Sequence, residues 1–304
     1  MNEIYIYVSL TLLGLVFGSF AGATVWRLRA RQLKEDAAEG YDVDKAELKK
    51  LNKVSNNKLK DDRSVCLHCG HNLQWFDLIP LISWLSIGGR CRYCKQSIGK
   101  FEPLIEIGVA AFFALSYAFW PADLNSWVEI VQLGLWLLAG VGLAILFAYD
   151  AKWFLLPNVV MWPVIALAAI FAGLEVYQAE ETVQKAVSVA GAITIFSGLY
   201  LAIYLFSRWK NGVNGTWVGF GDVKLGLALA LLLADWSLAF LALFMANLIG
   251  CLLVVPGLIS GKMSRGTHVP FGPLMIVGFI IAALWGSQLI AGYFSLLSSL
   301  VLAI

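Results

Sequence analysis

Long apolar runs recur along this chain, and their length is the feature that most restricts its fold. A helix needs about 20 apolar residues to cross a bilayer. A soluble chain cannot bury this much apolar surface, because 60% of the residues are hydrophobic and only 14% are charged. The sequence therefore predicts an all-α polytopic membrane protein with about eight transmembrane helices. We place the runs at roughly residues 4–26, 103–120, 127–149, 158–178, 185–206, 223–235, 237–259 and 273–303.

The first and sixth runs have unusual lengths. Residues 4–26 are too long for the core of a signal peptide and follow no basic segment, so we expect them to stay as a helix. Residues 223–235 offer only about 18 Å of helix at 1.5 Å per residue. That is less than the roughly 30 Å hydrocarbon core of a bilayer. Asp222, which precedes this short run, is therefore expected to lie below the membrane surface.

Positive charge predicts the orientation of the chain in the membrane. The segment from Arg27 to Phe101 holds 15 of the 22 lysine and arginine residues, and the later loops on the same side hold six more. Only Lys185 falls on the opposite side. Because basic residues collect in the cytoplasm, we expect the long segment there and both termini outside. The net charge of +2 gives no indication of nucleic-acid binding.

A polar insertion separates the first run from the second. We divide the chain into a first transmembrane helix (1–29), a cytoplasmic insertion (30–101) and a membrane core of helices 2–8 (102–304). Within the insertion, residues 30–63 are strongly charged and nearly free of aromatics. Residues 64–101 are instead rich in cysteine, glycine and aromatic residues. We find no internal repeat.

The charged part of the insertion is open to two interpretations. The stretch DVDKAELKKL (42–51) can form a short helix with Asp44 as its N-cap and Glu47 at N3. Its high charge and lack of aromatics are more typical of a solvated spacer. The sequence favours the spacer, with the helix as the alternative.

Four cysteines in residues 64–101 have the spacing of metal ligands. Two C-x2-C pairs are separated by a 21-residue gap, and two such pairs can surround a tetrahedral zinc ion. A cytoplasmic location disfavours disulfides; an iron–sulfur cluster and free thiols are less favoured alternatives. Four protein ligands leave no open position for substrate, so the zinc is expected to be structural, while Cys251 is expected to be buried and inert. The predicted ligands are Cys66, Cys69, Cys91 and Cys94.

Acidic residues beside the apolar runs are candidates for chemistry, because a charge there is unfavourable unless it caps, pairs or reacts. Besides Asp222, these are Glu102, Glu106 and Asp150. Taken alone, Asp222 is explained as the N-cap of the sixth helix. Taken alone, Asp150 is a boundary residue paired with Lys152. It stands at a helix C-terminus, where the macrodipole disfavours a negative charge.

The two aspartates are more informative as a pair. Both are expected at the cytoplasmic face on different helices, and Gly219 and Gly221 allow close backbone approach and positive φ beside Asp222. Two carboxylates within hydrogen-bonding reach share one proton. The ionised one can deprotonate a water while the protonated one polarises a peptide carbonyl. Asp150 and Asp222 therefore predict aspartic-protease chemistry. Lys224 is expected to pair with Asp222 or, as we favour, to snorkel toward lipid phosphates.

Several motifs resemble those of type IV prepilin peptidases. The stretch CLHCGHNLQWFDLIPLISWLSIGGRCRYCKQSIGK, followed by PLIE, is similar to the cytoplasmic domain of that family, and FGSF (17–20) to the end of its first helix. YDAKWFLLPN and GFGDVKLG resemble the segments with its two catalytic aspartates. VPFGP (269–273), with Pro270 and Gly272, resembles its last motif. The motifs occur in order along nearly the whole chain, and only residues 30–63 have no counterpart.

The resemblance implies two activities. One is cleavage of the basic leader from type IV prepilins or pseudopilins by Asp150 and Asp222, at the cytoplasmic face of a bacterial inner membrane. The other is methylation of the new N-terminus with S-adenosylmethionine as methyl donor, with which the resemblance associates Gly89 and Glu106. The residues alone explain Glu106 equally well as an interhelical polar contact. The sequence has no soluble G-x-G-x-x-G after a strand that would be an independent cofactor signature.

Four positions depart from the family's pattern. Gly22 stands where the family usually has asparagine, and Asn158 replaces the aspartate of its Leu-Pro-Asp segment. Phe101 and Glu102 replace an Arg-Tyr pair. None of these is one of the expected catalytic pair, so the departures bear on methylation more than on cleavage.

Two other functions are open alternatives. A presenilin-like protease also uses two aspartates, but the four-cysteine loop and the ordered motifs favour a prepilin enzyme. A non-catalytic scaffold or transporter is the other; a transporter would carry its acids near the bilayer midplane at an inverted-repeat interface. We expect the substrate to be a prepilin helix docked between the spans, with the zinc module over its leader. Lipid is the other expected contact.

Overall fold

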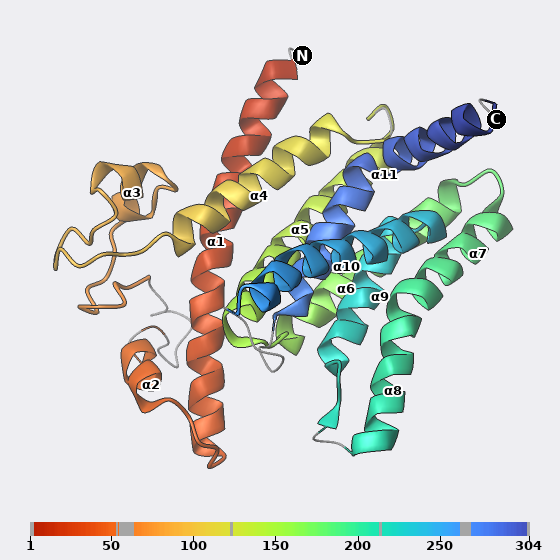
Figure 1. The fold of residues 1–304 in the computed structure, drawn as a ribbon. Helices are drawn as coiled ribbons and strands as arrows, with labels where there is room; N and C mark the ends of the chain where they lie inside the picture. Colours follow the sequence, from red (N-terminus) through yellow and green to blue (C-terminus); the bar gives the residue numbers. More distant parts are fainter. Residues whose placement is uncertain are drawn as a thin grey trace. The chain divides into compact units, whose positions relative to one another are not determined.

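The computed structural model describes residues 3–52, 54, 64–121, 124–212, 215–261 and 269–302, and most of these residues are in helices (Figure 1). These residues form no strands beyond two isolated bridges. The helical elements are α1 (Glu3–Ala38), α2 (Lys45–Leu51), η2 (Trp75–Leu78), α3 (Ile82–Ser86), α4 (Phe101–Ala118), α5 (Trp127–Trp153), α6 (Asn158–Gln178), α7 (Thr182–Ile193), η3 (Thr194–Gly198), α8 (Leu199–Asn211), α9 (Phe220–Leu233), α10 (Trp236–Ile259) and α11 (Phe271–Leu302).

Seven helices in the described ranges are long and apolar enough to cross a membrane. They are α1, α4, α5, α6, the continuous helix α7–η3–α8, α10 and α11. The predicted all-α membrane fold, with a four-cysteine module after the first long helix, is therefore confirmed. The remaining predicted run, the sixth (223–235), forms α9, which has only 14 residues and is not among the seven.

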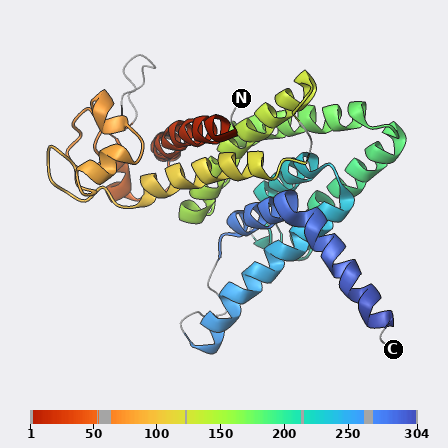
Figure 2. The ribbon, with the colours of Figure 1, turned by 90° about the horizontal axis from the view of Figure 1, so that it is seen from above.

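Residues 1–117 form one compact unit, built on two membrane helices. Helices α1 and α4 lie side by side (Figures 1 and 2). A Cβ at Gly14 would lie 2.6 Å from the Cα of Ala110, and one at Gly18 would lie 2.6 Å from the Cα of Glu106. Glycines four residues apart thus let the two backbones approach closely, as is typical of membrane helix pairs.

Helix α2 corrects the favoured prediction of a solvated spacer. Residues 45–51 form the helix that was the alternative, and the Asp44 carboxylate caps it by accepting from the N–H groups of Ala46 and Glu47. Leu51 packs with Ala30 and Leu33 of α1 in a small buried cluster. Helix α1 runs well past the predicted end at residue 26, and this extension provides the apolar surface that α2 covers. Residues 53 and 55–63 of the predicted spacer lie outside the described residues.

Residues 118–304 form the second unit, with the short helix α9 in its interior. Leu225, Ala228, Leu229 and Ala230 of α9 are fully buried. Helices α6, α7, α10 and α11 and the turn η3 all contact α9. A 14-residue helix is stable here because neighbouring helices, rather than water or lipid, surround its apolar side chains.

The described helices also refine other predictions. Cys251 lies exposed on α10 rather than buried, because the sequence pattern of an apolar helix does not distinguish its lipid-facing from its protein-facing side. The predicted span 185–206 is one continuous helix from α7 to α8, interrupted by the π-helical turn η3. The division into domains at residues 29 and 101 stays a prediction.

Candidate active site and metal centre

Asp150 lies in the last turn of α5, where its carboxylate is held by a distant backbone group. The N–H of Gly272, at the start of α11, donates to Asp150 Oδ2 at 3.0 Å. Phe154 is the C-cap of α5; it has a left-handed φ of 56° and donates its own N–H to the Asp150 carbonyl oxygen. The Asp150 residue is only 5% exposed. Its carboxylate is therefore buried and fixed by hydrogen bonding.

Asp222 is in the first turn of α9, but it is not the N-cap that the sequence predicts. The N-cap is Gly219, and Asp222 is at N3. Its Oδ2 accepts a hydrogen bond from the Gly219 N–H at 3.1 Å. Asp222 therefore caps the helix from inside its first turn. This hydrogen bond uses only Oδ2 of its carboxylate.

Asp150 and Asp222 lie near one another in the second unit. A Cβ at Gly272 would lie 2.8 Å from Asp150 Oδ2 and 3.5 Å from Leu225, one turn after Asp222 on α9. Asp222 also lies within electrostatic range of Asp150. The fold thus brings together two acids that lie 72 positions apart in the sequence.

The glycines beside Asp222 act through close packing. A Cβ at Gly221 would lie 3.1 Å from the side chain of Leu156, and one at Gly219 would lie 3.3 Å from Asp222 Oδ2. Close approach is thus confirmed. The expectation of positive φ is wrong: Gly219 has a φ of −73°, and Gly221 already lies within the regular helix α9.

Lys224 links α9 to α6. Neither predicted role, pairing with Asp222 or snorkelling to lipid phosphates, included this contact. Its Nζ donates to Asn158 Oδ1 at 2.8 Å and lies over the rings of Trp162 and Phe220, at 5.3 and 5.1 Å from their centroids. The side chain points to these partners because Asn158 begins α6 and offers a fixed acceptor. Asn158 was not among the predicted site residues, although its place in the Leu-Pro-Asn segment was a signal.

The remaining predicted site residues also have defined surroundings. Pro270 is half-buried in the short segment before α11. Glu106 of α4 is 7% exposed and accepts from the N–H of Leu81, at 2.8 Å. Gly89 has a φ of +67°, and a Cβ there would lie 2.8 Å from the ring of Trp84. Gly89 therefore meets a conformational and a packing requirement that only glycine satisfies at low cost.

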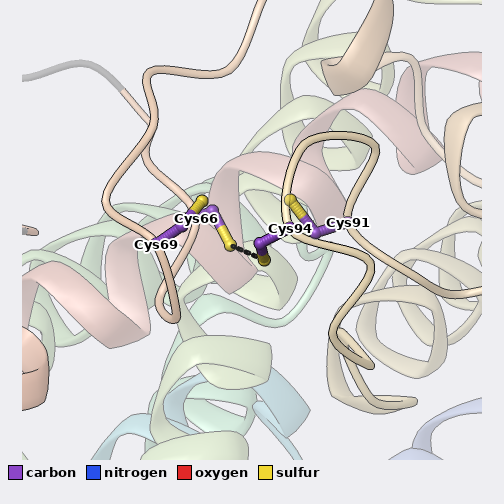
Figure 3. A group of neighbouring side chains, drawn as sticks. All are labelled: Cys66, Cys69, Cys91 and Cys94. Carbon is purple, nitrogen blue, oxygen red and sulfur yellow. Dashed lines mark hydrogen bonds between the residues drawn. The ribbon is translucent and has the colours of Figure 1, made fainter.

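The four predicted cysteine ligands gather at one point (Figure 3). Their sulfur atoms all lie within 4.8 Å of one another, and those of Cys66 and Cys94 are 3.9 Å apart. Two sulfurs bound tetrahedrally to one zinc ion at about 2.3 Å each would lie about 3.8 Å apart. The four residues are therefore close enough to bind a metal ion, and their spacing fits zinc.

The two cysteine loops are copies of one structure, which corrects the prediction that the chain has no internal repeat. The N–H of Gly70 donates to the Cys66 carbonyl, and that of Lys95 donates to the Cys91 carbonyl. Both Gly70 and Lys95 have positive φ. An antiparallel bridge closes each loop, at residues 65 and 72 and at residues 90 and 97. The repeat escapes sequence inspection because lysine occupies the second glycine position.

The cysteine cluster favours a cation for electrostatic reasons. Burial raises the pKa of the Cys66 thiol to about 12. At Cys91, burial is outweighed by the backbone N–H groups of Cys94 and Tyr93, which lower the pKa of the thiol to about 7. The cluster thus accepts one negative charge readily and resists further ones. A bound metal ion would stabilise the additional thiolates.

Asp77 links the two halves of the module. Its carboxylate accepts from Arg92 Nε and from the Tyr93 hydroxyl, each at 3.0 Å, and from the Gln74 N–H at 3.2 Å. Burial acts to raise the pKa of Asp77, but the Arg92 hydrogen bond and those of Gln74 and Tyr93 outweigh it and lower the pKa. Asp77 therefore joins η2 to the second cysteine loop as a carboxylate.

The second unit also contains a cavity of 510 Å³, away from the aspartates. It is lined by Trp120, Trp136 and the ion pair of Glu175 with Lys185, among others. Gln132 in its wall precedes Asp150 by 18 residues of α5, or about 27 Å of helix at 1.5 Å per residue. The cavity is thus at the opposite end of α5 and is not part of the aspartate site.

Comparison with known proteins assigns the chain to a family. A model of the bacterial peptidase A24 N-terminal domain matches residues 12–120, and a model of the type IV leader peptidase family matches residues 136–255. The prepilin leader peptidase/N-methyltransferase of Pseudomonas aeruginosa is 32% identical over 93% of this chain and 91% of its own length. The chain belongs to the type IV leader peptidase family. It is thus an enzyme, and the resemblance seen in the sequence is confirmed.

Two other relatives support this family assignment. The protein of the same name from Pseudomonas putida is 31% identical over 98% of this chain and 96% of its own length. The type 4 prepilin-like proteins leader peptide-processing enzyme of Escherichia coli is 32% identical over 88% of this chain and 89% of its own length. No solved structure matches the chain. Within this leader peptidase, the cysteines fall in the first matched region and both aspartates in the second.

Proposed function

We propose that this leader peptidase removes the leader from type IV prepilins or related pseudopilins, at the cytoplasmic face of a bacterial inner membrane. Asp150 and Asp222 are the proposed catalytic pair. One observation gives this proposal its main support. Two acids from different helices lie within electrostatic range, and each is held by the backbone N–H of a glycine, Gly272 or Gly219. The names of the similar enzymes supply the substrate class.

The proposed mechanism uses the shared proton of the pair. The ionised aspartate takes a proton from a water molecule as the water oxygen attacks the carbonyl carbon of the scissile peptide bond. The protonated aspartate donates its proton to the carbonyl oxygen. When the tetrahedral intermediate collapses, a proton passes to the amide nitrogen and the C–N bond breaks. Gly272 and Gly219 hold one oxygen of each carboxylate, which leaves the other free for these transfers.

We also propose that the enzyme methylates the new N-terminal amine, since the similar enzymes are named N-methyltransferases. S-adenosylmethionine, when bound, supplies the methyl group. Glu102 and Glu106 of the first unit fit a cationic ligand, because Glu102 Oε2 is buried without a hydrogen-bond partner among the described residues. Glu106 orders the module by accepting from Leu81, and Gly89 allows the fold around Trp84.

We assign a structural role to zinc at Cys66, Cys69, Cys91 and Cys94. Four sulfur ligands leave no open position for a substrate, and the module has little apolar core of its own to stabilise it. The proposed orientation counts the buried helix α9 as an eighth crossing, so that both termini are outside. It places this module in the cytoplasm, where it can cover the charged leader of a prepilin. The division at residues 29 and 101 is proposed on the same basis.

Cleavage of a prepilin-type substrate in reconstituted membranes tests this function. Wild type should release the leader, and Asp150→Asn and Asp222→Asn should each lose about 10³-fold or more in kcat, as expected for residues that act as a unit. The product mass shows whether one methyl group has been added. If both folded variants still cut, the aspartates are only capping or boundary residues. A membrane-helix substrate cut elsewhere would favour the presenilin-like alternative.

A further inference from the structure

Tyr200, at the start of α8, has a hydroxyl group that nothing in the proposed mechanism uses. The residue is 4% exposed, and its hydroxyl oxygen has no hydrogen-bond partner among the described residues. Asn247 is a polar side chain close to this hydroxyl, but it makes no contact of hydrogen-bond geometry with it, and its amide nitrogen donates to the Leu243 carbonyl. A buried hydroxyl without a partner is unfavourable, and such groups call for an explanation.

The packing of η3 and α8 against α9 places Tyr200 at the level of Asp222. A Cβ at Gly226 would lie 3.0 Å from the carbonyl oxygen of Phe196. One residue later, Ser197 Oγ donates to the Val223 carbonyl at 2.9 Å. Further along, the rings of Tyr204 and Phe220 are 5.4 Å apart. The two segments thus run antiparallel, and Tyr200 falls between the contacts made by residues 223 and 220.

The ring of Tyr200 also packs beside the start of α11, which holds Asp150. Its centroid lies 5.3 Å from that of Phe271, the residue before the Gly272 that donates to Asp150. The Tyr200 hydroxyl and Asp222 are close enough to interact electrostatically. Tyr200 therefore lies between the two elements that hold the aspartate pair.

The π-helical turn η3 sets the direction of Tyr200. It covers Thr194–Gly198, directly before α8. One extra residue in a helical turn rotates everything after it by about 100° relative to a regular α-helix. Without this turn, another residue of α8 would be aligned with Asp222. Turns of this kind occur frequently at functional sites.

We propose that the Tyr200 hydroxyl donates a hydrogen bond to the carbonyl oxygen of the scissile peptide bond. This inference rests on the proposed function of Asp150 and Asp222. Negative charge develops on that oxygen as water attacks, and a fixed donor stabilises it more in the transition state than in the substrate. Tyr200 keeps its proton throughout; the water proton and the carbonyl proton still pass through the two aspartates. Its hydroxyl has no partner because the substrate provides one.

Access to Tyr200 and to the aspartates is linked. Tyr200 is 4% exposed and Asp150 is 5% exposed. A substrate must open the site to reach Asp150, and the contact through Phe271 and Gly272 means that the same opening uncovers Tyr200. Catalytic hydrogen bonds often form only in the substrate complex.

The test compares Tyr200→Phe with Tyr204→Phe in the full chain, reconstituted in membranes. Tyr204 is one helical turn away, and its hydroxyl accepts from Arg208. Both variants lose one phenolic oxygen from α8. Tyr200→Phe should lower kcat about 100-fold, the loss typical of one oxyanion donor. Its KM and thermal midpoint should stay close to those of wild type, and Tyr204→Phe should keep the wild-type kcat.

Asp222→Asn, assayed alongside, separates this inference from the proposed function. If Asp222→Asn is inactive and Tyr200→Phe keeps the wild-type kcat, the inference is wrong and the proposed function stands. If Asp222→Asn cuts normally, the proposed function itself fails. A drop in thermal midpoint of Tyr200→Phe, with activity falling only as far as the folded fraction falls, would show a structural hydroxyl and overturn the inference.

Discussion

Gly272→Ala is the substitution whose effect the structure defines most sharply. The new Cβ would lie 2.8 Å from Asp150 Oδ2 and 3.3 Å from its Cγ, where ordinary contact begins at 3.4 Å. The Asp150 carboxylate must therefore move by about 0.6 Å, and a displacement of about 1 Å can reduce catalysis 100-fold. The move also weakens the 3.0 Å hydrogen bond from the Gly272 N–H. We expect kcat to fall between about 10- and 100-fold.

The stability of Gly272→Ala should change much less than its activity. Losing a hydrogen bond to a charged group costs about 1.5–3 kcal/mol, and replacing a helical glycine with alanine returns up to about 1 kcal/mol. A matched control lies on the same helix: a Cβ at Gly292 meets no atom within 4 Å. Gly292→Ala should keep the wild-type kcat. The assay is cleavage of a prepilin-type substrate, with thermal unfolding measured on the same samples. Wild-type kcat in Gly272→Ala would refute the reasoning.

Three further predictions concern the supports of the site and of the module. Lys224→Met should lower kcat several-fold by releasing α9 from Asn158, whereas Asn158→Asp, which keeps the acceptor, should not; equal losses in both would contradict this. Cys66→Ser should abolish stoichiometric zinc, measured by elemental analysis, and lower the thermal midpoint of the module, while unchanged zinc content would rule out the four-cysteine site. Asp77→Asn should destabilise the module by about 1 kcal/mol at pH 7. The lowered pKa of Asp77 means that its stabilisation is present above its ordinary pKa of 3.8 and is lost as the pH falls through the lower folded value; a wild type as unstable as Asp77→Asn at pH 7 would contradict this.

The sequence predicted the membrane helices well because length and hydropathy determine them. Seven of the eight runs became long apolar helices. Their ends were less predictable: α1 continues to Ala38, past its apolar run, because α2 packs against the extension. Helix α2 was the less favoured prediction because its apolar partner Leu33 lies outside the stretch 42–51 that predicts the helix.

The aspartate site was predictable in its members and not in its geometry. Asp150 and Asp222 stood out because charges beside apolar runs are unfavourable. Their hydrogen bonds to Gly272 and Gly219 depend on how α11 and α9 begin, which no local pattern encodes. Tyr200 carried no signal at all, since a tyrosine in an apolar helix is ordinary until a π-helical turn aligns it with α9.

In the four-cysteine module, too, the residues were predictable from the sequence and their conformation was not. Its ligands followed from the spacing of the cysteines, which is a property of sequence. The repeat of its two loops did not, because Lys95 adopts the positive φ that glycine adopts at position 70. The hydrogen bond between Arg92 and Asp77 joins residues 15 positions apart, and no local sequence pattern predicts it.

The central claim is that Asp150 and Asp222 act as one catalytic unit, and the kinetics of a double variant test it most directly. The measurement is the cleavage rate of a prepilin-type substrate by Asp150→Asn, Asp222→Asn and the doubly substituted chain, in the same membranes. Residues that share one proton lose their function together, so all three variants should show the same residual rate. A single variant that retains substantial activity, or a double variant whose loss is the product of the two single losses, would contradict the account.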